Sequence, residues 1–244
     1  MTDISPVTVV TSGNAAKAAI QAGNTLSRVL EDADGPILLL FSGGSALKIL
    51  DSLRPNVFSS CVTFTVLDER CSSDPAASNY LKVLMHPVMK KAIGRGARSI
   101  NTTASAGETP TKLAAKFEHE LRKWKIQFPD GKIIATVGMG PDGHTFGMIP
   151  YAEDPLAFDR MFVHTDHWVV GYDAGDKNQY PLRVTTTVPF AGLITASIWY
   201  VSGQEKTVML QRAMDPSIPV HVVPARIILD MNDVTLFTDC PLTK

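Results

Sequence analysis

The chain has 244 residues, of which 45% are hydrophobic and 19% are charged, a composition typical of globular proteins that excludes disorder as the main state. This length fits one α/β domain spanning residues 1–244. The formal net charge is −1, and no basic block of the nucleic-acid-binding type occurs, so we expect no nucleic-acid partner. A small anion needs only two or three nearby cations, so a phosphorylated metabolite is a candidate ligand.

The cysteines and the apolar segments indicate the cellular compartment of the protein. Cys61, Cys71 and Cys240 form no C-x-x-C pair and are odd in number, which favours reduced thiols in a cytoplasmic protein. Met1–Val10 lacks the pattern of a secretion signal, and no stretch approaches 18 uninterrupted apolar residues. We therefore expect a cytoplasmic protein without a membrane partner. The oligomeric state is not indicated.

The hydrophobic pattern predicts strands that alternate with helices. Strands are expected at Val7–Val10, Ile37–Phe41, Cys61–Leu67, Lys132–Val137, Arg183–Thr187, Ser197–Val201, Arg226–Leu229 and Val234–Phe237. Helices are expected at Asn14–Glu31, Ala46–Leu53, Asn79–Lys91, Pro110–Lys125 and Gln204–Met214. Tyr151–Pro181 gives only one weak strand, at His167–Gly171. This alternation favours a mainly parallel sheet covered on both faces.

Three polar clusters follow three of the predicted strands. They are Ser42-Gly43-Gly44-Ser45, Asp68-Glu69-Arg70 and the stretch from Gly138 to His144. In open α/β sheets, ligands bind beyond the carboxyl ends of the strands. We therefore expect the three clusters to form one site.

The first two clusters each have a functional and a structural interpretation. Residues 42–45 suit a phosphate, because glycines permit close approach and a following helix presents free N–H groups. A tight turn with a serine cap is the alternative. Asp68-Glu69-Arg70 places a carboxylate and a guanidinium at the site, or else forms an exposed loop with a salt bridge.

The third cluster satisfies G-x-G-x-x-G, but a dinucleotide fingerprint needs a crossover helix directly after its last glycine. Pro150 follows Gly143 too closely for such a helix, so we reject that interpretation. The loop instead presents Asp142 and His144. Histidine is the natural general base at neutral pH, and a neighbouring carboxylate favours that role over a structural one.

Other residues and absences complete the interpretation. Arg183 and Lys206 are candidate anion ligands, although either could be a surface charge. The chain contains no G-x-S-x-G or P-loop motif. His164 and His167 stand three apart, without H-E-x-x-H or a cysteine cluster. We expect neither a metal nor a cofactor.

Six motifs together resemble those of the 6-phosphogluconolactonases, a group related to the glucosamine-6-phosphate deaminases. They are Ser42-Gly43-Gly44-Ser45, Asp68-Glu69-Arg70, Ser78-Asn79-Tyr80, Gly138-Met139-Gly140-Pro141-Asp142-Gly143-His144-Thr145, Arg183-Val184-Thr185 and Gly203-Gln204-Glu205-Lys206. The resemblance implies a Rossmann-like three-layer α/β/α fold without a cofactor. It implies hydrolysis of 6-phospho-gluconolactone to 6-phosphogluconate, within the oxidative pentose phosphate pathway.

The resemblance also implies a role for each matched residue. His144 would be the general base that activates water, Asp142 and Asp68 would orient this base and the sugar, and Arg70 would stabilise developing negative charge. The substrate and its phosphate would be bound by Ser42, Gly43, Gly44, Ser45, Gly140, Arg183 and Lys206.

Two other functions remain open. The deaminases carry Asp-Glu-Tyr in the second cluster and a glutamate soon after the histidine, whereas this chain continues Phe146-Gly147-Met148-Ile149. A non-catalytic sugar-phosphate-binding protein would keep the phosphate residues and lose the base. Ala46-Leu47, Cys71 and Phe146–Ile149 also depart from the lactonase pattern, so a different phosphosugar lactone is an alternative substrate.

Overall fold

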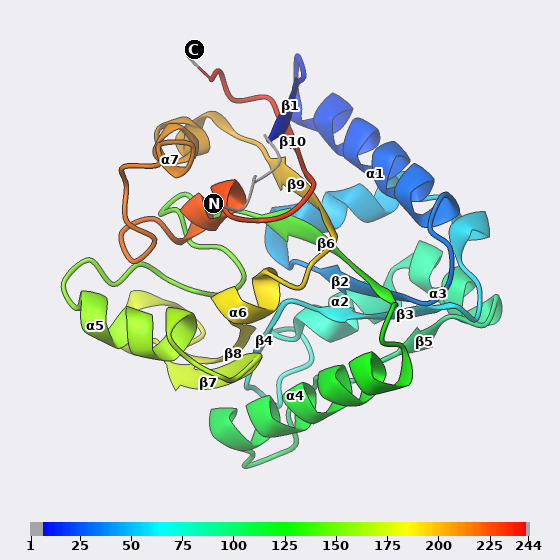
Figure 1. The fold of residues 1–244 in the computed structure, drawn as a ribbon, viewed down its shortest axis with the longest axis horizontal. Helices are drawn as coiled ribbons and strands as arrows, with labels where there is room; N and C mark the ends of the chain where they lie inside the picture. Colours follow the sequence, from blue (N-terminus) through cyan, green and yellow to red (C-terminus); the bar gives the residue numbers. More distant parts are fainter. Residues whose placement is uncertain (1–6, 243–244) are drawn as a thin grey trace.

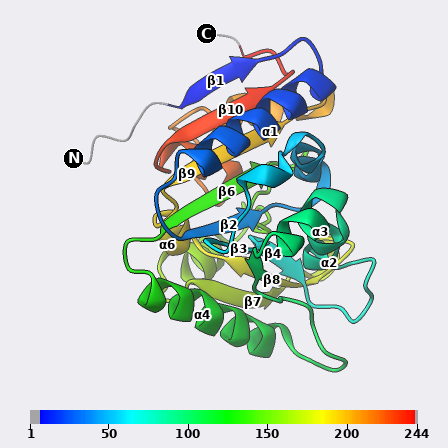
Figure 2. The ribbon, with the colours of Figure 1, turned by 90° about the vertical axis from the view of Figure 1, so that its right-hand side faces the viewer.

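The computed structural model describes residues 7–242, and its centre is a seven-stranded parallel sheet with the strand order β1-β10-β9-β6-β2-β3-β5. Figure 2 shows β1, β10, β9, β6, β2 and β3 one above another, beginning with β1 at the top. Their bounds are Thr8–Thr11 (β1), Ile37–Phe41 (β2), Val62–Val66 (β3), Arg98–Ser99 (β5), Lys132–Gly138 (β6), Ala196–Val201 (β9) and Val234–Thr238 (β10).

The sheet has a hydrophobic core on each face, and the central strand β2 contributes to both. Leu38 and Leu40 pack into one core, whereas Leu39 and Phe41 pack into the other. This division follows from the alternation of side chains along a strand. An uninterrupted apolar strand is therefore stable only between two covering layers, as the sequence predicts.

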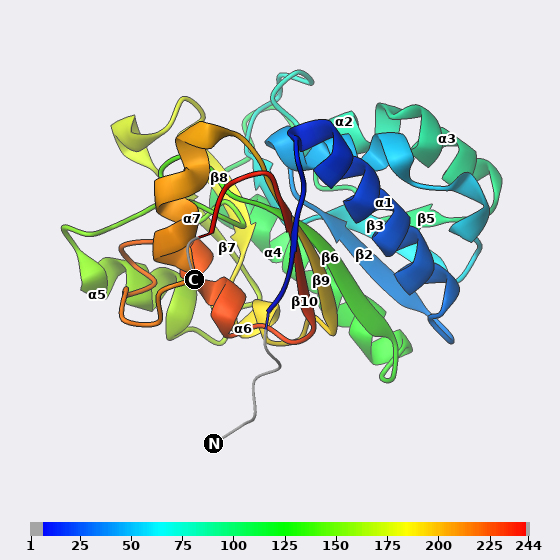
Figure 3. The same cartoon turned by 90° about the horizontal axis from the view of Figure 1, so that it is seen from above.

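Helices form those layers. Figure 3 shows α1 on one side of the sheet and α6 and α7 on the other. The α-helices are Ala15–Glu31 (α1), Asn79–Met85 (α2), Pro87–Gly94 (α3), Pro110–Gln127 (α4), Pro155–Phe158 (α5), Val188–Ala191 (α6) and Thr207–Ala213 (α7). Short 3-10 or π helices are Gly44–Ser52 (η1), Pro55–Val57 (η2), Asp159–Val163 (η3), Gly175–Lys177 (η4), Gln204–Lys206 (η5) and Pro224–Leu229 (η6). Among residues 7–242, no helix combines the length and the apolarity needed to cross a membrane.

A second, antiparallel sheet lies beside the first (Figure 1). Its strands are β4 (Asp68–Arg70), β8 (Leu182–Thr186) and β7 (Val169–Asp173), in that order. Its register places Arg70 opposite Arg183. The second cluster of the sequence is thus part of a strand, not an exposed loop, and this pairing brings it to Arg183 across more than a hundred residues of chain.

The structure confirms the three-layer α/β/α fold and the mainly parallel sheet. Asn14 caps α1, since its side chain accepts a hydrogen bond from the backbone N–H of Lys17 at 2.9 Å. The predicted helix Asn79–Lys91 is instead two helices, because Pro87 cannot continue the first of them. The predicted strand Arg226–Leu229 is wrong: this segment lies in η6, which starts at Pro224.

Candidate active site

A cavity of about 300 Å³ opens at the carboxyl ends of β2, β3 and β6. In the sheet, β2 lies between β3, which follows it in the chain, and β6, which comes later. The strand order therefore reverses at β2, and ligands of such sheets bind at this point. The lining residues are Ser42, Gly43, Gly44, Ser45, Asp68, Arg70, Asn79, Gly138, Met139, Gly140, Pro141, His144, Thr145, Phe146, Gly147, Arg183 and Lys206. They include members of all three clusters and every site residue predicted from the sequence except Asp142.

Asp142 does not line the cavity itself, but it hydrogen-bonds to His144, which does. Its Oδ1 lies 2.6 Å from Nδ1 of His144 and also accepts the backbone N–H of His144 at 3.2 Å. Burial acts to raise the pKa of Asp142, but the hydrogen bonds and the charge interaction with His144 outweigh it and lower that pKa. The carboxylate is therefore ionised at neutral pH and fixes the imidazole through Nδ1. Nε2 makes no hydrogen bond to any residue within 7–242, so it is free to act on a ligand.

The imidazole packs directly on the backbone of Gly140. A Cβ atom built there would lie 2.1 Å from Cε1 of His144 and 2.6 Å from Oδ1 of Asp142. Real Cβ atoms do not approach other atoms so closely, so only glycine leaves the histidine and the aspartate in this arrangement.

We therefore expect Gly140→Ala to displace the imidazole. The kcat of the reaction catalysed at this cavity should fall by about 10- to 100-fold, because a small misplacement of a catalytic group lowers the reaction rate. Turnover and thermal unfolding of the purified variant would be measured together. Gly94→Ala is the matched control, since a Cβ there meets nothing within 4 Å. An unchanged kcat in Gly140→Ala would mean that the position of His144 is not critical.

The chain after His144 forms a tight turn instead of a helix, which agrees with the rejection of a dinucleotide site. Phe146 has a φ of 56° and Gly147 a φ of 86°, and a bridge joins Thr145 to Met148. The second sheet holds this turn in place. Tyr172 donates its hydroxyl to the carbonyl oxygen of Gly147 at 2.5 Å.

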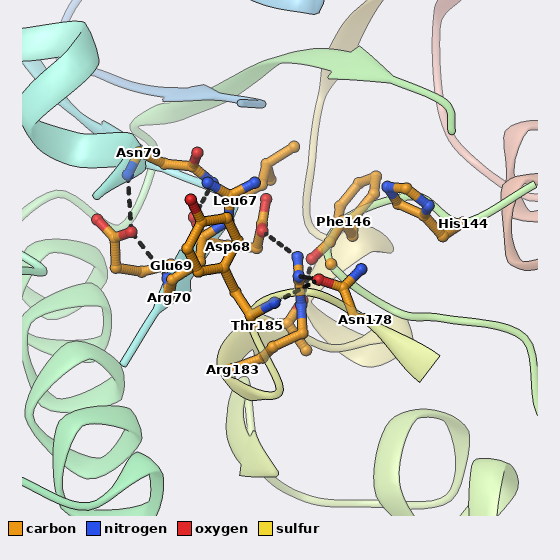
Figure 4. A network of polar contacts seen from close by, with 12 residues as sticks. Leu67, Asp68, Glu69, Arg70, Asn79, His144, Phe146, Asn178, Arg183 and Thr185 are labelled. Carbon is orange, nitrogen blue, oxygen red and sulfur yellow. Dashed lines mark hydrogen bonds and ion pairs between the residues drawn. The ribbon is translucent and has the colours of Figure 1, made fainter. Parts of the chain in front are cut away.

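A buried ion pair crosses the wall of the cavity (Figure 4). Nη2 of Arg183 lies 2.8 Å from Oδ2 of Asp68, and both residues are at least nine-tenths buried. Nη1 of Arg183 also donates to Oδ1 of Asn178 at 3.2 Å. Arg183 therefore lines the cavity with its charge already balanced by Asp68.

Arg70 presents a different kind of positive charge. It donates from Nη1 to the carbonyl oxygen of Ala77 at 2.9 Å, and its guanidinium lies 5.2 Å from the centre of the Tyr180 ring. It forms no ion pair with any carboxylate in the described part of the chain. Its charge is therefore available to stabilise an anion that forms in the cavity.

Lys206 supplies a third cation at the glycine loop. Its Nζ donates to Oγ of Ser45 at 3.1 Å, which ties the start of α7 to the start of η1. Burial lowers the pKa of Lys206. Gly44, with a φ of 64°, turns the chain between β2 and η1, so the N–H groups at the start of η1 lie beside this ammonium.

Two residues of the site were given no role from the sequence. Asn79 lines the cavity, and Glu69 is fully buried behind it, where its carboxylate accepts the backbone N–H of Asn79 at 2.7 Å. The only sequence signals were membership of the motif Ser78-Asn79-Tyr80 for Asn79 and of Asp68-Glu69-Arg70 for Glu69. Among residues 7–242, no three His, Cys, Asp or Glu side chains gather as a metal site would require.

This arrangement defines an α/β protein whose polar cavity combines a carboxylate-held histidine with three cations, a site suited to a small anionic substrate. The family model of glucosamine-6-phosphate isomerases/6-phosphogluconolactonase matches residues 12–237. The chain belongs to this family.

Individual relatives are distant. A 6-phosphogluconolactonase from Nostoc sp. is 26% identical over 147 residues, which make up 59% of this chain and 56% of that protein. One from Thermotoga maritima is 25% identical over 201 residues, covering 81% of this chain and 84% of that protein. The chain thus matches little more than half the length of the Nostoc relative.

Solved structures show the same fold. A 6-phosphogluconolactonase from Shewanella baltica has a TM-score of 0.78 at 22% identity, over 96% of this chain and 97% of that one. The enzyme of that name from Plasmodium vivax has a TM-score of 0.75 at 14% identity, over 98% of this chain and 92% of that one. The fold predicted from the sequence is confirmed.

Proposed function

We propose that the protein hydrolyses 6-phospho-D-glucono-1,5-lactone to 6-phosphogluconate. The observation that carries this proposal is the contact of 2.6 Å between Asp142 and His144 at the edge of a cavity that also contains Arg70, Arg183 and Lys206. Family membership and the names of the relatives support it. The partner of the protein in this proposal is a small molecule, the phosphorylated lactone. Residues 1–244 act as one domain.

The reaction begins with water. Nε2 of His144 takes a proton from a water molecule, and the oxygen of this water attacks the lactone carbonyl carbon. Asp142 stabilises the imidazolium that forms on His144. The carbonyl oxygen becomes negatively charged, and Arg70 stabilises it in the manner of an oxyanion site. The tetrahedral intermediate then collapses: the bond from carbon to the ring oxygen breaks, and His144 returns the proton to that oxygen.

The phosphate binds at the other end of the cavity. Three kinds of donor are available there: the ammonium of Lys206, the hydroxyl of Ser45 and the N–H groups of the glycine loop. The ammonium and the serine hydroxyl already lie in contact, so one phosphate can reach both. Gly43 and Ser42 complete this wall, and Gly140 lines the cavity from the loop that follows β6. Arg183 lines the same cavity as a further hydrogen-bond donor, and its ion pair holds Asp68 in position to accept a hydrogen bond from the sugar.

An aminosugar-phosphate deaminase is the second candidate, since the family includes such isomerases. The described cavity wall contains no glutamate, and its only carboxylate is Asp68. Ring opening and proton transfer would therefore lack the second acid that the deaminase pattern supplies.

The proposal is tested by presenting three compounds to the purified protein: 6-phosphogluconolactone, unphosphorylated gluconolactone and glucosamine 6-phosphate. We expect the first to be hydrolysed with the highest kcat/KM, the second only weakly, and the third to release no ammonia. Ammonia release would establish the deaminase instead. Tight binding of phosphorylated sugars without any turnover would establish a binding protein.

A further inference from the structure

Asn79 presents an unused hydrogen-bond acceptor at the cavity. Its side chain is 1% exposed, and its Nδ2 donates to the backbone carbonyl of Asp68 at 3.0 Å, which fixes the orientation of the amide. Its Oδ1 is buried and has no hydrogen-bond partner within residues 7–242. A buried polar atom without a partner costs about 1–3 kcal/mol, so this one calls for an explanation.

The glycine loop leaves room for this amide. A Cβ atom at Gly43 would lie 2.2 Å from Oδ1 of Asn79, so the absence of a side chain at Gly43 creates the space that the oxygen occupies. Both residues line the cavity. The acceptor therefore lies where the first and second clusters of the sequence meet.

Glu69 holds Asn79 in this position. Oε1 of Glu69 accepts the backbone N–H of Asn79 at 2.7 Å and that of Arg70 at 2.8 Å. Oε2 accepts the N–H of Tyr80 at 2.9 Å and the hydroxyl of Ser78 at 2.8 Å. The carboxylate thus caps the start of α2 and links Asn79 rigidly to Arg70 (Figure 4).

A carbonyl oxygen can only accept a hydrogen bond, and this restricts the group that it can recognise. The phosphate and the lactone carbonyl of the proposed substrate are themselves acceptors at neutral pH, whereas each ring hydroxyl can donate. Because Oδ1 loses its water when the protein folds, a hydroxyl that reaches it meets an acceptor already prepared for binding.

We propose that Asn79 determines specificity by accepting a hydrogen bond from one ring hydroxyl of the phosphorylated lactone. The proposal rests on the proposed function. It places the hydroxyl-bearing part of the sugar between Asn79 and Asp68, whose carboxylate also lines the cavity, and it directs the phosphate towards Ser45 and Lys206.

The test pairs a variant with altered substrates. Wild-type protein and Asn79→Leu, which is similar in size but has no acceptor, are assayed with 6-phosphogluconolactone and with its 2-, 3- and 4-deoxy analogues. We expect Asn79→Leu to lower kcat/KM about 10- to 100-fold on the full substrate. On one deoxy analogue the two proteins should be equal, because the hydroxyl that Asn79 binds is missing there.

A purely structural role would lower kcat/KM by the same factor on all four lactones, and that result would overturn the proposal. Asn24→Leu, on the exposed face of α1, is the matched control. If Asn79→Leu does not fold, Asn79→Ser is assayed in the same way. A wild-type protein that hydrolyses none of the four lactones would refute the proposed function, and hydroxyl recognition with it.

Discussion

Replacing His144 by alanine is expected to lower kcat for hydrolysis of the phosphorylated lactone by about 10²- to 10⁴-fold, the usual contribution of a general base. The side chain is partly exposed and, among residues 7–242, hydrogen-bonds only to Asp142, so its removal opens no hole in the core. Initial rates and thermal unfolding measured on the same preparation would separate the loss of catalysis from a loss of folding.

Asp142→Asn refines this test, because it keeps an oxygen near Nδ1 of His144 but removes the charge that stabilises the imidazolium. We expect an intermediate loss of kcat, and we expect the double variant to be no slower than His144→Ala alone, since the two residues act as a unit. His119→Ala, on the exposed face of α4, should retain full activity. Losses in the double variant that multiply would show that the two residues act independently.

Replacing Arg183 by methionine is expected to lower the free energy of unfolding by about 3–5 kcal/mol, because Asp68 is then left as a buried charge without its partner. The loss should appear in denaturant titrations followed by tryptophan fluorescence. Substrate binding should weaken as well, since the cavity wall loses the guanidinium and is left with the unpaired negative charge of Asp68.

Combining Asp68→Asn with Arg183→Met measures how much of each single loss of stability comes from the interaction between the two residues. With both charges absent, no buried charge lacks a partner, so we expect the double variant to be more stable than the sum of the two single losses predicts. Free energies of unfolding that simply add would show that the contact of 2.8 Å does not couple the two residues.

The sequence was sufficient to predict the sheet and the edge of the sheet at which the three polar clusters meet. Buried apolar runs such as Ile37–Phe41 and Lys132–Val137 predict central parallel strands, and polar clusters directly after them predict the edge at which a ligand binds. These features are local, which is why they can be read from a single chain. The structure places all three clusters on one cavity.

What could not be predicted depends on contacts between distant segments. Glu69 is buried only because donors from residues 78–80 surround its carboxylate, and Arg183 meets Asp68 only through the second sheet. Neither pairing leaves a periodic signal. The strand predicted at Arg226–Leu229 is wrong for another reason: a short buried apolar run does not distinguish a strand from a helical turn.

The most direct test of the account follows freshly generated 6-phosphogluconolactone over time in the presence of the protein. The product is oxidised by a coupled dehydrogenase, and the spontaneous hydrolysis is subtracted. We predict rapid turnover by the wild-type protein and a rate near background with an equal concentration of His144→Ala. A wild-type rate no faster than spontaneous hydrolysis, or an equal rate in the variant, would contradict the role assigned to this site.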